Sequence, residues 1–372
     1  MMQEHYLDVK SVRRYCEEVF SRHGFCQEDC HRIVDVILTA DLYGIESHGI
    51  QRMQRYHDSL TRKLVDVSAK PEIIFETPLS AVLEANRAMG QTTAYMAMTM
   101  AIYKAKQHGF GAVTVRNCNH YGIAGYYAKM ATAEDLIGGS STNTEAIAIP
   151  TFGKQAMLGT SPLAFGMPAD PYDFLFDCAT TVVPRGKIEI YNKRSQPLVK
   201  GWAADENGQS CTDAAHVLDN INKKEFGGIF PIGGESKLTG SHKGYGLGII
   251  AEIFTGILSG GDTSPHVENG GMGDTSFGFF ALDYGLFGDK QQIRSRLSAL
   301  LQELRDSAKA DGCERIYTHG ELEMESMRDK LSNGIPASEK TVEELIGIGA
   351  DMGLNYSDYV QEKDAAAGRP VT

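Results

Sequence analysis

The chain has 372 residues, a formal net charge of −12 at pH 7 and an isoelectric point near 5.4. A chain of this length forms about two or three ordinary domains, and its acidic balance argues against nucleic-acid binding. Charges occur early in the N-terminal segment, no long uncharged apolar run follows, and the seven cysteines are scattered without a C-x-x-C pair. We therefore expect no signal peptide and no membrane span, and a reduced, cytoplasmic protein.

The pattern of apolar residues predicts a mixture of helices and strands. The chain begins with helices over 8–22 and 28–43, and Ser47 looks like the N-cap of a third helix that runs to about Lys63. The later predicted elements are strands over 79–84, 112–115 and 276–287 and helices over 94–108, 123–133, 244–259, 290–309 and 340–353. Residues 136–202 have a strand-rich pattern, 203–240 a loop-like one, and 368–372 resemble a loose tail.

Three histidines stand in glycine-containing frames, at Ser47-His48-Gly49, Asn119-His120-Tyr121-Gly122 and Ser241-His242-Lys243-Gly244. Histidine titrates near neutral pH, and glycine lets the backbone approach a ligand. On the predicted third helix, His48, Arg52 and Tyr56 recur at four-residue steps and share one face. His48 can exchange a proton while Arg52 holds a carboxylate, although a solvated or salt-bridged helix face has the same pattern more often.

Two further segments have both a functional and a structural interpretation. His120 follows a predicted buried strand, where acid, base or orienting groups are common, or it is a turn histidine that caps the next helix. The segment 240–246 opens a helix with Lys243 and several glycines, which suits a diphosphate or is simply a glycine-tolerant helix start. It is neither a G-x-G-x-x-G fingerprint after a strand nor a Walker A loop.

Asp177 ends an apolar strand and is followed by Thr180 and Thr181. The carboxylate suits a ribose diol and the hydroxyls a phosphate, although a strand-end aspartate is ordinarily a turn former. Two other motifs are discounted. Cys26, Cys30 and His31 lack a clear fourth zinc ligand, and Leu163 replaces the second glycine of a nucleophile elbow. We expect no metal site, and a metal-dependent hydrolase using the three histidines is disfavoured.

Six motifs in a fixed order carry a family resemblance. They are Ala40-Asp41 through Gly49 to Tyr56, Asn119-His120, Gly159 to Ala164, Asp177 to Thr181 with Gly186-Lys187-Ile188, Gly201-Trp202-Ala203 and His242 to Leu247. Together they resemble the type 2 malate/L-lactate dehydrogenase family, which includes ureidoglycolate, sulfolactate and 2,3-diketogulonate oxidoreductases, over residues from about 8 to about 355. The resemblance implies an α/β fold distinct from the Rossmann fold, with a mixed sheet and a helical subdomain formed by the two ends of the chain.

The resemblance also implies roles for particular residues. His48 and His120 become the acid/base candidates, with Arg52 as the carboxylate partner and Ser47 beside it. The implied cofactor contacts are Thr142, Asn143, Thr144, Asp177, Cys178, Ala179, Thr180, Thr181, Lys243, Gly244, Gly320 and Glu321. The chain departs from the family pattern at Thr144, Cys178 and Thr181, and its segment over 213–240 is longer than is common.

The implied function is hydride transfer between a nicotinamide cofactor, NAD slightly ahead of NADP, and a small 2-hydroxy or 2-oxo acid. Malate or L-lactate is the first expectation, and ureidoglycolate, sulfolactate, an imino acid and a sugar-derived keto acid are alternatives. A non-catalytic nucleotide-binding protein is the alternative of another class. The family pattern implies a homodimer with a small carboxylate substrate and no nucleic-acid or membrane partner.

The expected organisation has three regions. A helical region over 1–75 packs with 290–372, a central α/β region combines 76–135 with 245–290, and 136–244 binds the cofactor.

Overall fold

The computed structural model describes residues 4–268 and 272–363, and its centre is a seven-stranded sheet in the order β2-β3-β4-β11-β5-β6-β7. The strands are β2 (Glu72–Glu76), β3 (Ser80–Glu84), β4 (Phe110–Asn119), β5 (Ile137–Thr142), β6 (Leu163–Met167), β7 (Phe174–Cys178) and β11 (Met272–Leu282). Only β3 and β4 pair in parallel, and the other neighbours in this sheet are antiparallel. A Rossmann sheet is mostly parallel, so the predicted α/β class with a mixed, non-Rossmann sheet is confirmed.

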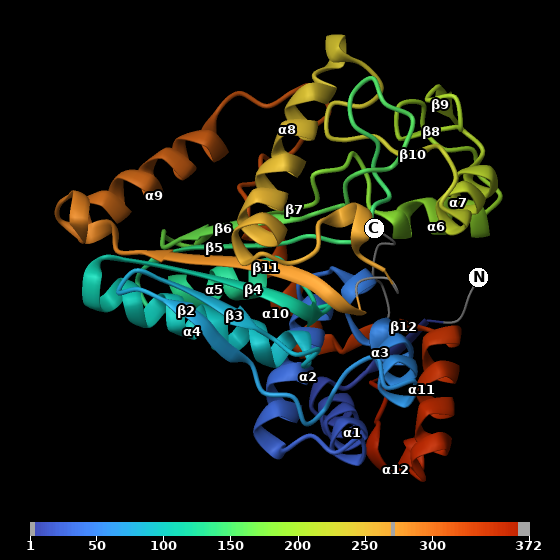
Figure 1. The fold of residues 1–372 in the computed structure, drawn as a ribbon. Helices are drawn as coiled ribbons and strands as arrows, with labels where there is room; N and C mark the ends of the chain where they lie inside the picture. Colours follow the sequence, from blue (N-terminus) through green and yellow to red (C-terminus); the bar gives the residue numbers. More distant parts are fainter. Residues whose placement is uncertain (1–3, 269–271, 364–372) are drawn as a thin grey trace.

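Helices cover both faces of the large sheet (Figure 1). α4 (Gly90–His108) and α5 (Ala124–Thr132) lie on one face, and α8 (Ser241–Glu252) with the π-helical segment Ile253–Ile257 lies on the other. The close packing on β5 requires glycine. A Cβ atom on Gly138 would lie 2.5 Å from the carbonyl oxygen of Ala128, and one on Gly139 would lie 2.0 Å from the ring of Phe280. The glycine-rich β5 therefore lets a helix and an aromatic ring approach its two faces.

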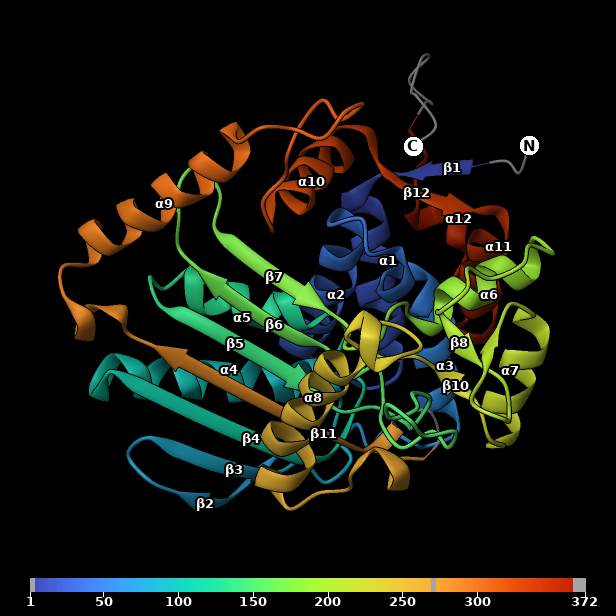
Figure 2. The ribbon, with the colours of Figure 1, turned by 90° about the horizontal axis from the view of Figure 1, so that it is seen from above.

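The two ends of the chain form a helical subdomain (Figure 2). Its elements are β1 (Glu4–Leu7), α1 (Val9–Arg22), α2 (Gln27–Leu42), α3 (Met53–Thr61), β12 (Ile335–Ser338), α11 (Glu339–Met352) and α12 (Tyr356–Tyr359). β1 pairs antiparallel with β12. α2 joins this subdomain to the sheet, because Ile33 and Ile37 lie in the helical core while Val36 and Ala40 lie in the core beneath the sheet.

A smaller unit follows β7 in the chain. It contains α6 (Arg185–Lys193), α7 (Ala214–Lys223) and a three-stranded sheet of β8 (Ala203–Ala204), β9 (Ser210–Cys211) and β10 (Gly228–Ile229). Ile188, Val217 and Ile229 are buried in its own core. The prediction of a loop over 203–240 was wrong here. The Asp213 carboxylate accepts from two backbone N–H groups at the start of α7, a capping pattern that was overlooked.

Other elements also differ from the predictions. The expected helix from Ser47 to Lys63 is two 3-10 turns, Glu46–His48 and Ile50–Arg52, followed by α3. The strand-rich middle contains α6, and the strand predicted over 276–287 ends at Leu282, before a 3-10 turn. α9 (Lys290–Asp306) was predicted, whereas β1, β2, α10 (Glu321–Asn333), β12 and α12 were not. Residues 368–372 lie outside the described residues, and the three-region division stays a prediction. Over the part of the chain that the structure describes, no helix is long and apolar enough to cross a bilayer.

Candidate active site

The rings of His48 and His120 lie face to face, with centroids 5.5 Å apart and planes 24° apart. His48 ends the first 3-10 turn, and His120 lies in the loop that follows β4. The start of α4 supports that loop closely. A Cβ atom on Gly90 would lie 2.1 Å from the carbonyl oxygen of Asn119 and 2.3 Å from that of His120, so only glycine fits. Tertiary packing therefore brings together two histidines that are distant in sequence.

Hydrogen bonds at Nδ1 orient both rings. The Ser47 hydroxyl lies 2.9 Å from Nδ1 of His48, and the Tyr56 hydroxyl lies 2.8 Å from Nδ1 of His120. Within the described residues, neither Nε2 atom has a hydrogen-bond partner. A fixed hydrogen bond at one ring nitrogen leaves the other open to a ligand, which here is Nε2 of each ring.

A buried aspartate shapes the turn that presents His48. Oδ2 of Asp41 accepts from the backbone N–H of Ile50 at 2.7 Å, and a Cβ atom on Gly49 would lie 1.8 Å from Oδ1 of Asp41. Burial raises the pKa of Asp41 to about 8. This contact separates the two 3-10 turns, and it explains why the predicted continuous helix does not form. The sequence motif contained Asp41 but assigned it no role.

A cavity of about 310 Å³ opens at the histidine pair. Its lining residues are Ser47, His48, Arg52, Arg55, His120, Thr144, Glu145, Ile147, Thr160, Pro184, Arg185, Gly186 and Glu189. The structure thus brings together all four predicted catalytic residues and Thr144. Arg55 and Arg185 were missed. The position of Arg55, three residues after Arg52, indicates a shared helical face, whereas Arg185 belongs to a helix that the sequence pattern did not predict.

The cavity is electropositive. Burial, then Arg52 and Arg55, lower the pKa of His48 to about 4. Burial, then Arg55, His48 and Arg52, hold the pKa of His120 well below its ordinary value. Burial also lowers the pKa of Arg55. Both histidines are therefore neutral near pH 7 in the ligand-free protein, and the surrounding guanidinium groups favour an anionic ligand.

The predicted cofactor residues near β5 have different surroundings. The side chain of Asn143 is buried, donates to the carbonyl oxygen of Asp262 at 2.7 Å and accepts from the N–H of Ser276 at 2.8 Å. The Thr142 hydroxyl donates to the Asn143 carbonyl oxygen. Thr144 lines the cavity, and its hydroxyl accepts from the N–H of Thr160 at 3.0 Å. Thr142 and Asn143 therefore fix the loop that presents Thr144.

Polar side chains at the end of β7 and just after it stabilise the local fold. The Asp177 carboxylate accepts from the N–H of Gly125 at 2.6 Å, and burial raises its pKa to about 6. The Cys178 thiol donates to the carbonyl oxygen of Ala179. The buried hydroxyls of Thr180 and Thr181 donate to the carbonyl oxygens of Thr160 and Val183. These side chains make local hydrogen bonds, and they are not among the described residues that line the cavity at the histidine pair.

Gly320 and Glu321 stand at the start of α10, against β7. The buried Glu321 carboxylate forms ion pairs with Arg305 and Arg315 and accepts from the N–H of Thr318. A Cβ atom on Gly320 would lie 2.7 Å from the carbonyl oxygen of Asp173. Neither residue is among the described residues that line the cavity at the histidine pair.

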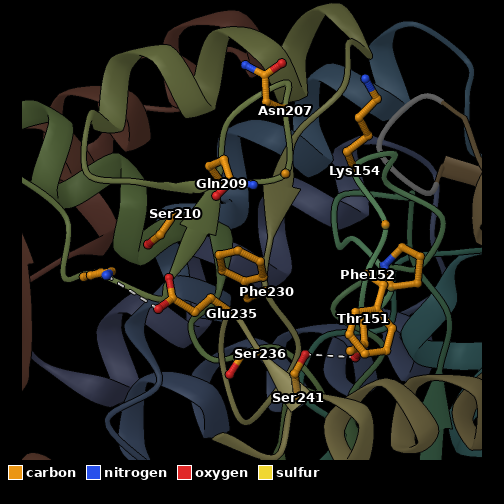
Figure 3. Close-up of a pocket in the computed structure, with 14 residues that line it drawn as sticks. Thr151, Phe152, Lys154, Asn207, Gln209, Ser210, Phe230, Glu235, Ser236 and Ser241 are labelled. Atoms are coloured by element: carbon orange, nitrogen blue, oxygen red, sulfur yellow. Dashed lines mark hydrogen bonds and ion pairs between the residues drawn. The ribbon is translucent and has the colours of Figure 1, made fainter. Parts of the chain in front are cut away.

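The start of α8 borders a second cavity, of about 620 Å³ (Figure 3). The hydroxyl of Ser241, the first residue of α8, lies 2.9 Å from that of Thr151, and Lys154 also lines this cavity. Lys243 is exposed in the same helical turn. A Cβ atom on Gly244 would lie 2.3 Å from the carbonyl oxygen of Ile232, so packing demands glycine there. Segment 240–246, which was predicted to bind a diphosphate, therefore does not line the cavity at the histidine pair.

Comparison with known proteins identifies the fold and the family. The sequence profile of the malate/L-lactate dehydrogenase family matches residues 7–346. This chain belongs to that family. A malate dehydrogenase from Pyrococcus abyssi is 38% identical over 363 residues, covering 95% of this chain and 99% of the relative. An L-sulfolactate dehydrogenase from Methanocaldococcus jannaschii is 35% identical, again over 95% of this chain and 99% of the relative.

The crystal structure of malate dehydrogenase from Entamoeba histolytica has the same architecture as this member of the malate/L-lactate dehydrogenase family. The TM-score is 0.91 with 33% identity, over 95% of this chain and 99% of that one. The family resemblance and the fold expected from the sequence are therefore confirmed, and the chain is an oxidoreductase. The described residues contain no group of three or more histidine, cysteine, aspartate or glutamate side chains arranged to hold a metal ion.

Proposed function

We propose that the chain catalyses reversible, NAD(P)-dependent reduction of a small 2-oxo acid to the 2-hydroxy acid, with the oxaloacetate/malate pair as the first candidate. The observation that carries this proposal is the stacked pair of His48 and His120 facing one cavity with Arg52. Proton exchange at an alkoxide and capture of a carboxylate are the two tasks that this chemistry sets. The named relatives act on malate and sulfolactate, which supports an acid of this size.

The residues in and around the cavity have different proposed roles. Arg52 orients the substrate carboxylate, and Arg55 adds positive charge beside it. During oxidation, Nε2 of neutral His48 or His120 takes the proton of the C2 hydroxyl, and during reduction the imidazolium form of that ring returns a proton to the oxygen at C2. Ser47 and Tyr56 hold the two rings through Nδ1.

The surroundings of the cavity fit a dinucleotide. The buried hydroxyl of Ser161 has no hydrogen-bond partner in the described part of the chain, and its neighbour Thr160 lines the cavity. Gly248 of α8 packs near Thr180, seven residues after Ser241. Seven residues of α-helix, about 10 Å, therefore separate the Gly248 contact with Thr180 from the first turn of α8.

The chain therefore offers a hydroxyl-lined end and a helix N-terminus for a cofactor. Thr144, Thr160 and the first turn of α8 with Lys243 would hold it, the last through N–H groups and positive charge. When bound, the reduced nicotinamide supplies the hydride. NAD remains our first candidate, ahead of NADP.

We also propose a homodimer. α8 and the π-helical segment expose a row of large apolar side chains, Leu247, Ile249, Ile250, Ile253, Phe254, Ile257 and Leu258, each between 37% and 58% exposed. A continuous apolar strip of this kind commonly marks a protein interface, and two-fold dimers bury the same surface from both copies.

We further propose a cytoplasmic location. All seven cysteines are free thiols, which supports it.

The proposed function is tested with one panel of substrates. Purified protein is mixed with NADH or NADPH and with oxaloacetate, pyruvate or sulfopyruvate, and absorbance at the nicotinamide band is followed with and without EDTA. We expect EDTA-insensitive oxidation of the cofactor. Cofactor binding without turnover of any acid would favour the non-catalytic alternative, and loss of turnover in EDTA would favour a metal-dependent reaction.

A further inference from the structure

We propose that Arg185, in the first turn of α6, selects substrates that carry a second anionic group in addition to the carboxylate held by Arg52. This proposal rests on the proposed function and deepens it, because it assigns the contact to the distal end of the substrate. The cavity, the surroundings of the Arg185 side chain and the distribution of charge support it independently.

The cavity is lined by two different parts of the chain. The first part supplies Ser47, His48, Arg52, Arg55 and His120, and it contains the proposed proton-exchanging groups. The second part includes Thr144, Thr160 and the start of α6 at Pro184, Arg185 and Gly186, and Arg185 is the only cation among its described lining residues. Burial, and then neighbouring charges that include Arg185, lower the pKa of Arg55, so the two guanidinium groups act on one cavity. In the proposal, a short acid held by Arg52 places its second anionic group at Arg185.

The Arg185 side chain is held in place but still has donors to offer. Its Nε donates to Oε1 of Glu189 at 3.0 Å, and its Nη2 donates to Oδ1 of Asn222 at 2.7 Å. A guanidinium has five N–H donors, and none of the hydrogen bonds among the described residues engages Nη1. The side chain is 38% exposed. Arg185 is thus preorganised by two contacts and retains donors for a ligand.

The backbone at the start of α6 adds to this site. Pro184 is the N-cap residue of α6, and it has no side-chain group that could accept from the helix. The first backbone N–H groups of α6 are therefore open to a ligand. A Cβ atom on Gly186 would meet no other atom within 4 Å, which shows free space beside the first turn. A helix N-terminus favours negative charge. Together with Arg185, this turn forms a place for an anionic group.

Two carboxylates also line the cavity, and each already has a basic partner. Glu189 pairs with Arg185, and Glu145 lies 3.2 Å from Nζ of Lys224. Arg52 and Arg55 add further positive charge to the lining of the same cavity. The pairing therefore limits repulsion between these glutamates and an incoming anion.

The size of the cavity points to the class of substrate. At about 310 Å³ it is at the small end of ligand sites, and because Thr144 and Thr160 of its lining are proposed to hold the cofactor, the remaining space suits a short acid better than a sugar acid. Malate and sulfolactate, the substrates named for two relatives, both carry a second acid group, whereas lactate carries a methyl group. The methyl group of lactate cannot accept a hydrogen bond from Arg185. We therefore expect the protein to prefer a substrate with a second acid group over lactate.

The test compares Arg185→Gln and Arg185→Lys with the wild type. The matched control is Lys193→Gln, which removes an exposed charge at the other end of α6. Each protein is assayed with oxaloacetate and with pyruvate, and NADH affinity is measured separately by fluorescence titration. Thermal unfolding checks that α6 remains folded.

We expect Arg185→Gln to lower kcat/KM for oxaloacetate about 10- to 100-fold, the loss typical of one hydrogen bond to a charged group. Activity with pyruvate should change by less than about threefold, because a methyl group makes no such bond. The dissociation constant of NADH should not change. Arg185→Lys should recover part of the oxaloacetate activity, since it keeps the charge but loses the planar fork.

Other outcomes separate the two proposals. Equal losses with both acids together with weaker NADH binding would assign Arg185 to the cofactor and overturn the substrate role. Unchanged oxaloacetate kinetics in a folded Arg185→Gln variant would also overturn it while leaving the proposed function intact. A wild-type protein that reduces neither acid nor sulfopyruvate would overturn the proposed function and the Arg185 assignment together.

Discussion

The hydroxyl of Tyr56 lies 2.8 Å from Nδ1 of His120, and this contact joins two separate cores of the protein. Tyr56 is buried in the helical core formed by the two ends of the chain. Tyr121, the residue after His120, is buried in the core beneath the large sheet. The proposed active site therefore lies where the helical subdomain meets the sheet, and its geometry depends on both.

Removing the imidazole of His48 or His120 should strongly reduce turnover. His48→Ala and His120→Ala should each lower kcat by roughly 10²–10⁴-fold, the usual loss for a general acid or base. Steady-state kinetics with oxaloacetate and NADH measure the effect. His31→Ala is the control, because the His31 side chain is 65% exposed and remote from the cavity lining. Near-normal turnover in both site variants, with intact cofactor binding, would refute the assignment.

Removing only the Tyr56 hydroxyl should affect catalysis moderately. Tyr56→Phe keeps the buried ring but releases Nδ1 of His120, and we expect kcat to fall by about 2- to 10-fold, in line with one neutral hydrogen bond. NADH affinity should stay the same. Tyr15→Phe is a matched control, because the Tyr15 hydroxyl donates to the carbonyl oxygen of Leu345 in the same core. That variant should lose thermal stability without losing kcat, and a parallel loss of kcat in both would contradict a positioning role for Tyr56.

The pH profiles of kcat and kcat/KM should differ. Burial and the neighbouring arginines lower the pKa of His48 to about 4 in the free protein, and they lower the pKa of His120 further below its ordinary range. A bound anion offsets the arginine charges, so the histidine pKa values should rise in the substrate complex. For malate oxidation, the acid limb of kcat should therefore lie at higher pH than that of kcat/KM. Coincident limbs would show that the substrate does not offset these charges.

Asp41→Asn should change how stability depends on pH. The buried Asp41 has its pKa raised from 3.8 to about 8, so the folded protein retains a proton that the unfolded chain has lost. Its contribution to stability therefore falls as pH rises from about 4 to about 8. Asparagine keeps an acceptor for the Ile50 N–H and removes this titration. Its melting temperature should exceed that of the wild type by roughly 2–6 °C at pH 8.5 and by less at pH 5.

The control for this experiment is Asp41→Ala, which lacks the acceptor for Ile50 and should melt below the wild type at both pH values. Thermal unfolding followed by circular dichroism gives both comparisons. An Asp41→Asn difference that is the same at pH 5 and pH 8.5 would mean that Asp41 does not titrate in this range.

The proposed dimer should depend on the apolar strip of α8 and the π-helical segment. Ile253→Glu combined with Ile257→Glu places charges on side chains that are 43% and 58% exposed, and it should yield monomers in light scattering after size exclusion. Leu300→Glu is the control, because Leu300 is 51% exposed on α9. A double variant with the same mass as the wild type would exclude this strip as the interface.

The sequence alone predicted much of the scaffold. The helices α1, α2, α9 and α11 have an amphipathic 3.6-residue pattern, α4 and α5 are runs rich in small and apolar residues, and β3 and β4 have compact apolar runs, so local pattern was sufficient to find them. The two-residue strands β8 to β10 were missed because their pattern is too brief, and α7 was missed because its Asp213 cap was overlooked. The family motifs also predicted the non-Rossmann fold, which the structural comparison confirms.

The site was predicted in part. His48, Arg52 and His120 could be named because titrating or basic side chains stand beside glycines in recognisable motifs, and the structure places them around one cavity. Their catalytic roles stay predictions. The order of side chains in the sequence does not show that the Tyr56 hydroxyl reaches His120, or that Arg185 lines the same cavity as Arg52. Those relationships arise from contacts between distant segments.

By itself, the sequence determined the local elements, the acidic charge balance and the set of residues able to move a proton or bind a carboxylate. Only the tertiary structure decided which of these residues share a cavity and how far burial shifts each pKa. It also decided which threonine and asparagine side chains make hydrogen bonds that hold loops in place. The physical reason is that local spacing fixes the direction of neighbouring side chains, whereas desolvation and charge interactions depend on every segment packed around a group.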